Sequence, residues 1–208
     1  MQSSLVVVTP AQSESLVSLY EAKLALNLTA SNATLDEQIE MMIEWGSSEI
    51  AALCNRTFAQ ETVTETFTQL DSYHNRLYLT RYPVTDIDTV DEDGTELTAG
   101  TDFSIDAASG LLTRTDGVWG TPLTVTYTGG YDLPNDSPRA LRQAALLMTR
   151  EAYYAMSRGD ASIRMVSHKD SRVIYFDPNA SKSGSSSGGS AARRSIGDLL
   201  KHFTRFNV

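Results

Sequence analysis

The stretch that most constrains this chain is residues 123–158, where a strand leads into a long helix. Apolar side chains alternate with threonine in its first part, which is the period of a strand with one buried face. The glycine pair 129–130 ends the strand, because glycine permits backbone angles that a strand does not use. Ser137 and Pro138 then supply an N-cap and a first helical residue, and nothing in 139–158 breaks a helix. The chain is therefore predicted to combine strands with helices.

The predicted helix in residues 138–158 carries apolar side chains on two sides. At about 100° per residue, one side is rich in alanine and includes Leu141, Ala144 and Met148. The opposite side mixes basic, aromatic and aliphatic residues, namely Arg139, Arg142, Leu146, Arg150, Tyr153 and Tyr154. A helix of this kind is often packed on both sides. This arrangement of residues around the helix fits burial of the helix in the core of one monomer, and it fits a contact between subunits equally well.

The N-terminal part of the chain contains two helix-start signals. Residues 1–17 have no clear pattern and are predicted to form an arm that orders on assembly. Residues 18–21 and 34–37 each match a capping box, so a helix is expected to begin at each. After the second capping box, apolar residues recur every three or four positions up to Cys54. Gly46 in the middle of this stripe indicates that another backbone lies close.

Residues 61–128 change to the period of strands, and turn signals separate the apolar runs. Strands are expected near residues 61–70, 76–80, 84–91, 102–106, 110–114 and 123–128. The predicted fold class is α+β: a small helical bundle with an inserted antiparallel β-sheet, followed by a flexible C-terminal linker and a terminal amphipathic helix.

The C-terminal segment is polar, with one predicted strand at residues 172–176. Residues 179–194 are rich in serine and glycine and are expected to form a flexible linker. Residues 195–208 form the last predicted unit, a docking helix at about 195–206. Its apolar side chains fall within about 120° of one another; they are Ile196, Leu199, Leu200, Phe203 and Phe206. A helix this short is marginal alone in water, so it is expected to pack against something.

The composition is that of a soluble globular protein, with 41% hydrophobic and 21% charged residues. The net charge of −9 is unevenly distributed. Residues 1–138 hold 5 Lys and Arg against 21 Asp and Glu, whereas residues 139–208 hold 12 against 5. This division disfavours a general nucleic-acid binder and favours complementary surfaces, including surfaces on copies of the same chain. The apolar run at 5–8 is far too short to span a membrane, so no membrane association is expected. It also has no basic leader of the kind that starts a secretion signal, so the protein is expected to be made in the cytoplasm.

No catalytic or metal-binding pattern emerges. Phosphate-loop, dinucleotide, metalloprotease and serine-hydrolase motifs are missing from the sequence. The acidic residues at 86–96 do not have the spacing of a calcium loop, and a solvated hairpin rim explains them better. His74, His168 and His202 lie in different segments, and Cys54 is expected to be a buried small hydrophobe. The sequence therefore predicts no enzyme activity, no cofactor and no metal site.

The order of these features resembles the head–tail connector (adaptor) family of tailed bacteriophages. The resemblance covers residues 18–158. It is carried by the opening helix at 19–24, a second helix through 36–58, the segments 79–84 and 125–131, and the helix from Pro138. The residues from about 159 onward extend beyond the family pattern.

The resemblance implies a structural protein of the virion, made in the cytoplasm of a bacterial host. Family members form a ring, typically of about twelve subunits, below the portal protein. Such a ring extends the channel through which double-stranded DNA passes, without sequence-specific binding, and offers a surface to the next tail or neck protein. Residues 18–178 would form the connector core, with its β insertion at about 61–128.

Two apolar surfaces are given roles from their own physical character, because the 138–158 helix is apolar on two sides and the C-terminal helix lies beyond the family pattern. The mixed face of the 138–158 helix is predicted to be a subunit interface, and the stripe on the C-terminal helix is predicted to dock into the portal. The alternative for that stripe is packing against its own chain. Alternative functions are another neck or tail completion protein, or a DNA-binding regulator. The last would need a basic face that residues 1–138 do not supply.

Overall fold

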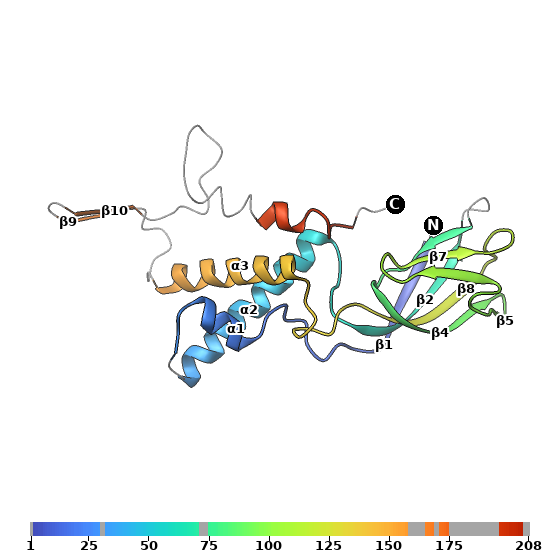
Figure 1. Ribbon diagram of the computed structural model, residues 1–208, viewed down its shortest axis with the longest axis horizontal. Helices are drawn as coiled ribbons and strands as arrows, with labels where there is room; N and C mark the ends of the chain where they lie inside the picture. Colours follow the sequence, from blue (N-terminus) through green and yellow to red (C-terminus); the bar gives the residue numbers. More distant parts are fainter. Residues whose placement is uncertain are drawn as a thin grey trace, which may run out of the picture. The chain divides into compact units, whose positions relative to one another are not determined.

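The strand and helix patterns fold into two separate units in a computed structural model of the chain (Figure 1). The structure describes residues 2–29, 32–70, 75–157, 165–168, 171–174 and 196–205. One unit, the β unit, comprises Met1–Glu14 and Arg56–Asp136. The other, the helical unit, comprises Ser15–Asn55 and Ser137–Val208. The α+β class predicted from the sequence is confirmed.

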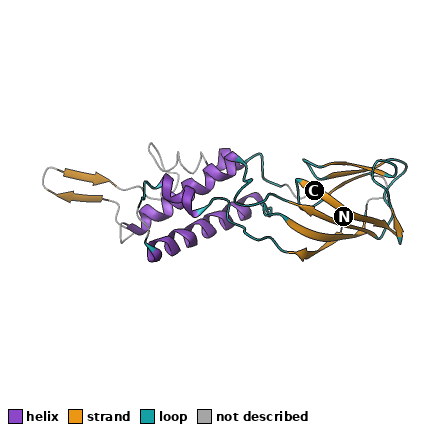
Figure 2. Ribbon diagram, turned by 60° about the horizontal axis from the view of Figure 1, so that its bottom comes forward, coloured by secondary structure: helices purple, strands orange, loops and turns teal. Residues whose placement is uncertain are grey.

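The β unit contains two antiparallel sheets (Figure 2). The five-stranded sheet has the order β1-β2-β8-β4-β5, with β1 at Gln2–Thr9, β2 at Glu61–Gln69, β8 at Leu123–Gly129, β4 at Val84–Glu92 and β5 at Thr95–Glu96. The three-stranded sheet has the order β3-β7-β6, with β3 at Arg76–Tyr78, β7 at Leu111–Arg114 and β6 at Phe103–Asp106. The strands expected between residues 61 and 128 are confirmed, and the hairpin β4–β5 adds a short one.

The core of the β unit follows from the alternation along its strands. In β8, Leu123, Val125 and Tyr127 are fully buried, and the threonines between them are only partly covered. They join Phe67 from β2 and Phe103 from β6 in one apolar cluster that both sheets supply. Side chains of successive strand residues point to opposite faces, so the threonine face lies on the outside of the five-stranded sheet.

Strand β1 differs from the arm expected for residues 1–17. Gln2–Thr9 pairs antiparallel with β2 within the isolated chain, and Leu5 packs against the apolar cluster. Val6 and Val8 remain exposed at the edge of the sheet. The run of consecutive apolar residues has no alternation, and its partner strand is distant in sequence. The sequence pattern therefore gave no sign of the pairing.

The helical unit begins with α1 (Leu19–Ala25), whose start is as predicted. The Ser18 hydroxyl accepts a hydrogen bond from the Glu21 amide at 3.2 Å, and the Glu21 carboxylate accepts one from the Ser18 amide at 3.0 Å. Helix α2 (Ala33–Cys54) does not use the predicted capping box at 34–37. Asn32 occupies the extended N-cap position instead, so Thr34 already lies within the first turn.

Helices α2 and α3 (Arg139–Ser157) pack against each other, and α1 contacts both (Figure 1). Ile39, Ile43 and Ile50 form the buried face of α2. Gly46 lies at the contact, where a methyl group in its place would be 3.3 Å from Cβ of Met148. The close approach predicted from Gly46 is therefore confirmed. The description of this part as a small helical bundle is not confirmed.

The remaining described residues form a hairpin and a short helix. Strands β9 (Met165–His168) and β10 (Ser171–Ile174) pair antiparallel, and β10 matches the first part of the strand expected at 172–176. Residues 196–200 are helical, so this helix ends well before the predicted residue 206. Residues 175–195, which include the predicted Ser/Gly linker, and residue Phe206 lie outside the described residues.

Candidate assembly surfaces

The side of α3 that faces away from α2 is the predicted subunit interface. Leu141, Ala144 and Ala145 are fully buried on the inner side, and Arg139, Arg150 and Tyr154 are exposed on the outer side. Leu146 and Tyr153 are half-buried between them. The Arg150 guanidinium carbon lies 5.7 Å from the centre of the Tyr154 ring, and the Tyr153 and Tyr154 rings meet edge to face. The structure thus brings five of the six predicted residues to one outward surface, which we call the α3 face.

Arg142 is the sixth predicted residue, and its contacts are different. Its Nη1 lies 3.3 Å from Oε1 of Glu21, the residue that closes the capping box of α1. Its Nη2 also donates to the Ser137 carbonyl oxygen at 3.3 Å. Arg142 therefore ties α3 to the start of α1 within the chain.

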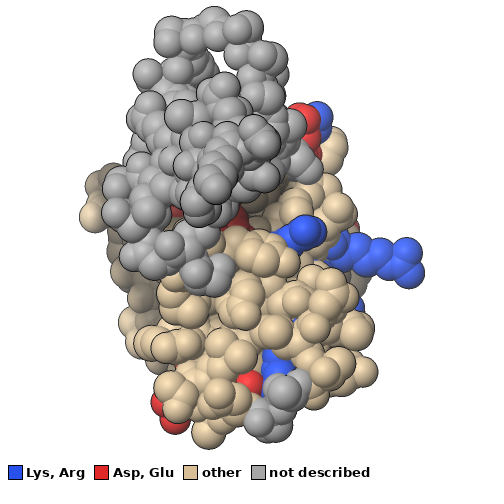
Figure 3. All heavy atoms as spheres, turned by 90° about the vertical axis from the view of Figure 1, so that its left-hand side faces the viewer, with Lys and Arg blue, Asp and Glu red and all other residues tan. Residues whose placement is uncertain are grey.

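A second exposed surface lies on α2 and was not predicted from the sequence. Met41 and Trp45 are 61% and 53% exposed, on the side of α2 opposite its buried isoleucines. We call the stripe made by Met41, Trp45, Ser48 and Ala52 the α2 face. The spacing of the two large residues, one turn apart, could have revealed it. Figure 3 shows one side of the molecule, on which the described surface is mostly uncharged with a few projecting Lys and Arg side chains.

The predicted apolar stripe of the C-terminal segment is only partly buried. Ile196 and Leu200 are 6% and 4% exposed in the isolated chain, whereas Leu199 and Phe203 are half-buried. The Arg205 amide donates to the Cys54 carbonyl oxygen at 2.8 Å, which ties the segment to the end of α2. Part of the stripe therefore packs against its own unit, as in the alternative considered for it.

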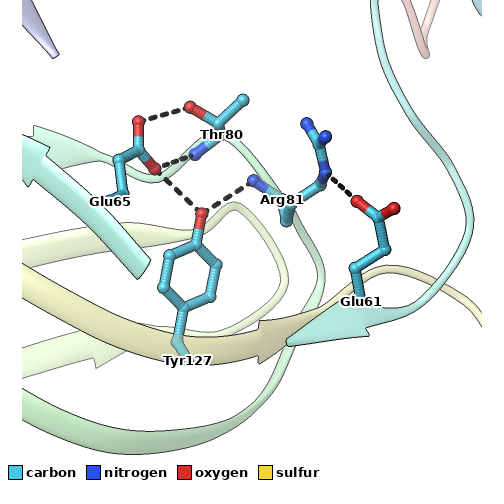
Figure 4. Close-up of polar contacts among 5 residues, drawn as sticks. All are labelled: Glu61, Glu65, Thr80, Arg81 and Tyr127. Carbon is cyan, nitrogen blue, oxygen red and sulfur yellow. Dashed lines mark hydrogen bonds and ion pairs between the residues drawn. The ribbon is translucent and has the colours of Figure 1, made fainter. Parts of the chain in front are cut away.

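A buried polar cluster joins strands β2 and β8 to the segment after β3 (Figure 4). The carboxylate of Glu65, which is 1% exposed, accepts hydrogen bonds from the Thr80 amide at 3.0 Å, the Thr80 hydroxyl, and the Tyr127 hydroxyl at 2.9 Å. The Tyr127 oxygen in turn accepts from the Arg81 amide at 3.0 Å. Burial, with a smaller contribution from the nearby Glu65 charge, raises the pKa of Tyr127 well above its usual range.

Two further contacts hold the same segment in place. Nε of Arg81 lies 2.8 Å from Oε2 of Glu61, and the Arg56 guanidinium stacks over the Tyr82 ring at 3.5 Å. Glu61 and Glu65 occupy inward positions in the alternation of β2, a signal that sequence analysis missed. The carboxylates of Glu61 and Glu65 are both paired with groups of this segment, so the cluster holds residues 79–83 against β2 and β8.

Metal-binding groups and membrane-spanning helices are both missing from the described residues. Within them, no group of three or more His, Cys, Asp or Glu side chains could hold a metal ion. None of the helices there is both long and apolar enough to cross a membrane. Cys54 is buried, as predicted, and His202 is exposed. His74 lies outside the described ranges.

Comparison with known proteins adds a family and a fold. The family model described as "HCP: Head completion protein" matches residues 15–164. A chain in a structure entitled "Neck of empty GTA particle computed with C6 symmetry" aligns over 99% of this chain and 97% of its own, with 17% identity and a TM-score of 0.58. A chain from "Virion of native gene transfer agent (GTA) particle" aligns over 98% and 96%, with 16% identity and a TM-score of 0.56.

A chain in "Neck of native GTA particle computed with C12 symmetry" aligns over 99% of this chain and 97% of its own, with 14% identity and a TM-score of 0.55. Comparison with curated proteins gave no match. At these identities the solved structures show that the chain shares their fold across both of its units.

Proposed function

Because this chain belongs to the head completion protein family, we propose that it is a structural head–tail adaptor of a tailed phage or phage-like particle. It forms a ring below the portal, extends the DNA channel and joins the head to the tail. The observation that carries this proposal is the family match, which spans parts of both units. The role is structural, and the particle's neck is its location.

The proposed ring has twelve subunits. The shared fold with a chain of a particle neck computed with C12 symmetry supports this number. The portal and the next tail or neck protein are the proposed partners on either side of the ring. A closed ring needs two different surfaces on each subunit, because every copy contacts a neighbour on each side.

The charge distribution supports a channel through which DNA passes without being held. Residues 1–138 hold 5 basic against 21 acidic residues, so the net charge of this part of the chain repels DNA phosphates that come within the Debye length of about 10 Å. Tight binding of DNA to the ring would slow the passage of the genome. A predominantly acidic subunit avoids such binding.

The ring proposal predicts that Tyr153→Asp impairs assembly more than folding. Tyr153 is half-buried on the α3 face, where a carboxylate would lose its charge solvation on contact with a neighbour. We expect subunit association to weaken about tenfold or more, and the free energy of unfolding to fall by only about 1 kcal/mol. Native mass spectrometry of the ring and thermal unfolding measure the two effects.

Tyr20→Asp is the matched control, because Tyr20 is exposed on α1, outside the α3 face. It should leave assembly unchanged. A Tyr153→Asp protein that forms rings as well as the control would remove α3 from the interface.

The C-terminal helix is proposed to contact the portal through the part of its stripe that its own chain leaves accessible. Leu199→Asp is therefore expected to reduce attachment to portal-bearing heads with little change in melting temperature. Leu200→Asp should instead destabilise the chain by about 2–5 kcal/mol, since Leu200 is buried. Co-sedimentation with heads and thermal unfolding distinguish the two variants. Normal attachment of Leu199→Asp, and of a chain lacking residues 191–208, would show that the segment only packs on its own unit.

A further inference from the structure

Helix α2 presents a surface that is exposed in the described part of the chain. Met41, Trp45, Ser48 and Ala52 fall within about 60° on a helical wheel, and all four are exposed. Ile39, Ile43 and Ile50 lie on the opposite side and are buried. Tryptophan and methionine are enriched in the cores of protein interfaces, so this face has the character of a contact surface.

The charges around the α2 face are all acidic. Helix α2 contains five acidic residues and no lysine or arginine. Glu44 and Glu49 flank Trp45 on either side, and both are exposed. Neither forms an ion pair with another residue of the described ranges. The apolar stripe is thus bordered by carboxylates that have no basic partner within the described chain.

The α3 face has the opposite charge. Arg139 and Arg150 are exposed on it, and neither forms an ion pair with a described residue. Leu146 lies between them along the helix, and Tyr154 lies one turn beyond Arg150; these two residues supply apolar and aromatic surface. The α3 face is therefore a basic surface with apolar and aromatic side chains beside its arginines. Its charge is opposite to that of the α2 face, and both faces contain apolar side chains.

One chain cannot bring these two faces together. Helices α2 and α3 contact each other through their buried sides, so their exposed sides point away from that contact. Both faces belong to the helical unit, and their relative position is fixed by that helix–helix packing. Two different complementary surfaces on opposite sides of one rigid element form a heterologous contact between copies, and such contacts generate rings when the rotation closes.

We propose that the α2 face of each subunit packs against the α3 face of the next copy of this chain. This inference rests on the proposed ring and names the second half of its subunit contact. Met41 and Trp45 pack against Leu146 and Tyr154, and the acidic border of one face meets Arg139 and Arg150 of the other. The apolar and aromatic side chains supply affinity, and the charges set the direction in which subunits add.

Charge exchange between the two faces tests the proposal. The acid-reversed variant carries Glu44→Lys and Glu49→Lys, and the base-reversed variant carries Arg139→Glu and Arg150→Glu. All four positions are exposed, so both variants should fold, which thermal unfolding verifies. Asp86→Lys with Glu96→Lys is the control for net charge, because both residues are exposed in the β unit. The readout is the number of copies that bind to DNA-filled heads lacking this protein.

Each reversed variant alone should bind at a level about tenfold or more below the wild type, since every contact then joins like charges. An equal mixture of the two should bind nearly as well as the wild type. In the mixture, a ring of alternating variants pairs opposite charges at every contact, and a ring with an even number of subunits can close in this way. The control should bind normally.

Each contrary result has a distinct meaning. If either reversed variant binds like the control, or if the mixture fails as its components do, the proposed pairing of α2 with α3 is wrong. A failure of the mixture would direct the search to the portal or a tail protein as the occupant of these faces. If the wild-type chain itself does not bind to heads, the adaptor function is wrong, whatever the variants do.

Discussion

Glu65→Ala is expected to lower the free energy of unfolding by about 2–5 kcal/mol, because it removes the acceptor shared by buried donors. The Tyr127 hydroxyl and the Thr80 amide both donate to this carboxylate inside the β unit. Without it, they remain buried and lose their acceptor, and the segment after β3 loses its attachment to β2. Chemical denaturation monitored by circular dichroism measures the change.

Two further variants make this result specific. Glu96→Ala should change stability by less than about 0.5 kcal/mol, because Glu96 is exposed on β5. Glu65→Gln should fall between the two, since its amide oxygen still accepts one hydrogen bond. An alanine variant as stable as the wild type would mean that the cluster contributes nothing net to folding, as happens for some buried charged groups.

Gly130→Ala is expected to have an effect of similar size, about 3 kcal/mol or more, because it combines backbone strain with a steric clash. Gly130 has φ of 113°, and a methyl group there would lie 2.3 Å from the carbonyl oxygen of Ala59. The clash involves backbone, which cannot move aside: the adjacent Tyr131 amide donates to the Phe58 carbonyl oxygen at 2.8 Å. The expected measurement is a large fall in the denaturation midpoint or a failure to fold.

Gly94→Ala separates the two causes. Gly94 also has positive φ, 81°, but no atom lies within 4 Å of the added methyl group. It should lose only about 1 kcal/mol, the cost of the left-handed conformation for alanine. If both variants lost the same amount, the close approach at Gly130 would not be a constraint on the fold.

The sequence by itself determined the elements that depend on local patterns. The strands of residues 61–128 were predicted because alternation with period two is visible within each of them. The start of α1 at Ser18 was predicted because both partners of a capping box lie within four residues. The family was also predicted, because it depends on the linear order of such elements, and the match of the family model confirms it.

Only the tertiary structure decided which chain segments meet across long separations. Strand β1 joins β2, and Glu65 meets Tyr127, through contacts between residues far apart in the sequence. The sequence places Glu65 on the inward side of a strand, but the groups that satisfy its charge come from other elements. Loop closure brings such groups together at an entropic cost that no local pattern records.

The exposure of the helix faces was also decided by tertiary packing and not by the local pattern. Periodicity placed Arg139, Arg150 and Tyr154 on one side of α3, but it was equally compatible with burial in a monomer's core. The packing of α3 against α2 through Gly46 decided that this side is exposed, and it left Met41 and Trp45 exposed as well. A helical wheel shows which residues share a face. Which face is covered depends on the neighbour that packs there, and that neighbour is defined only when the whole chain has folded.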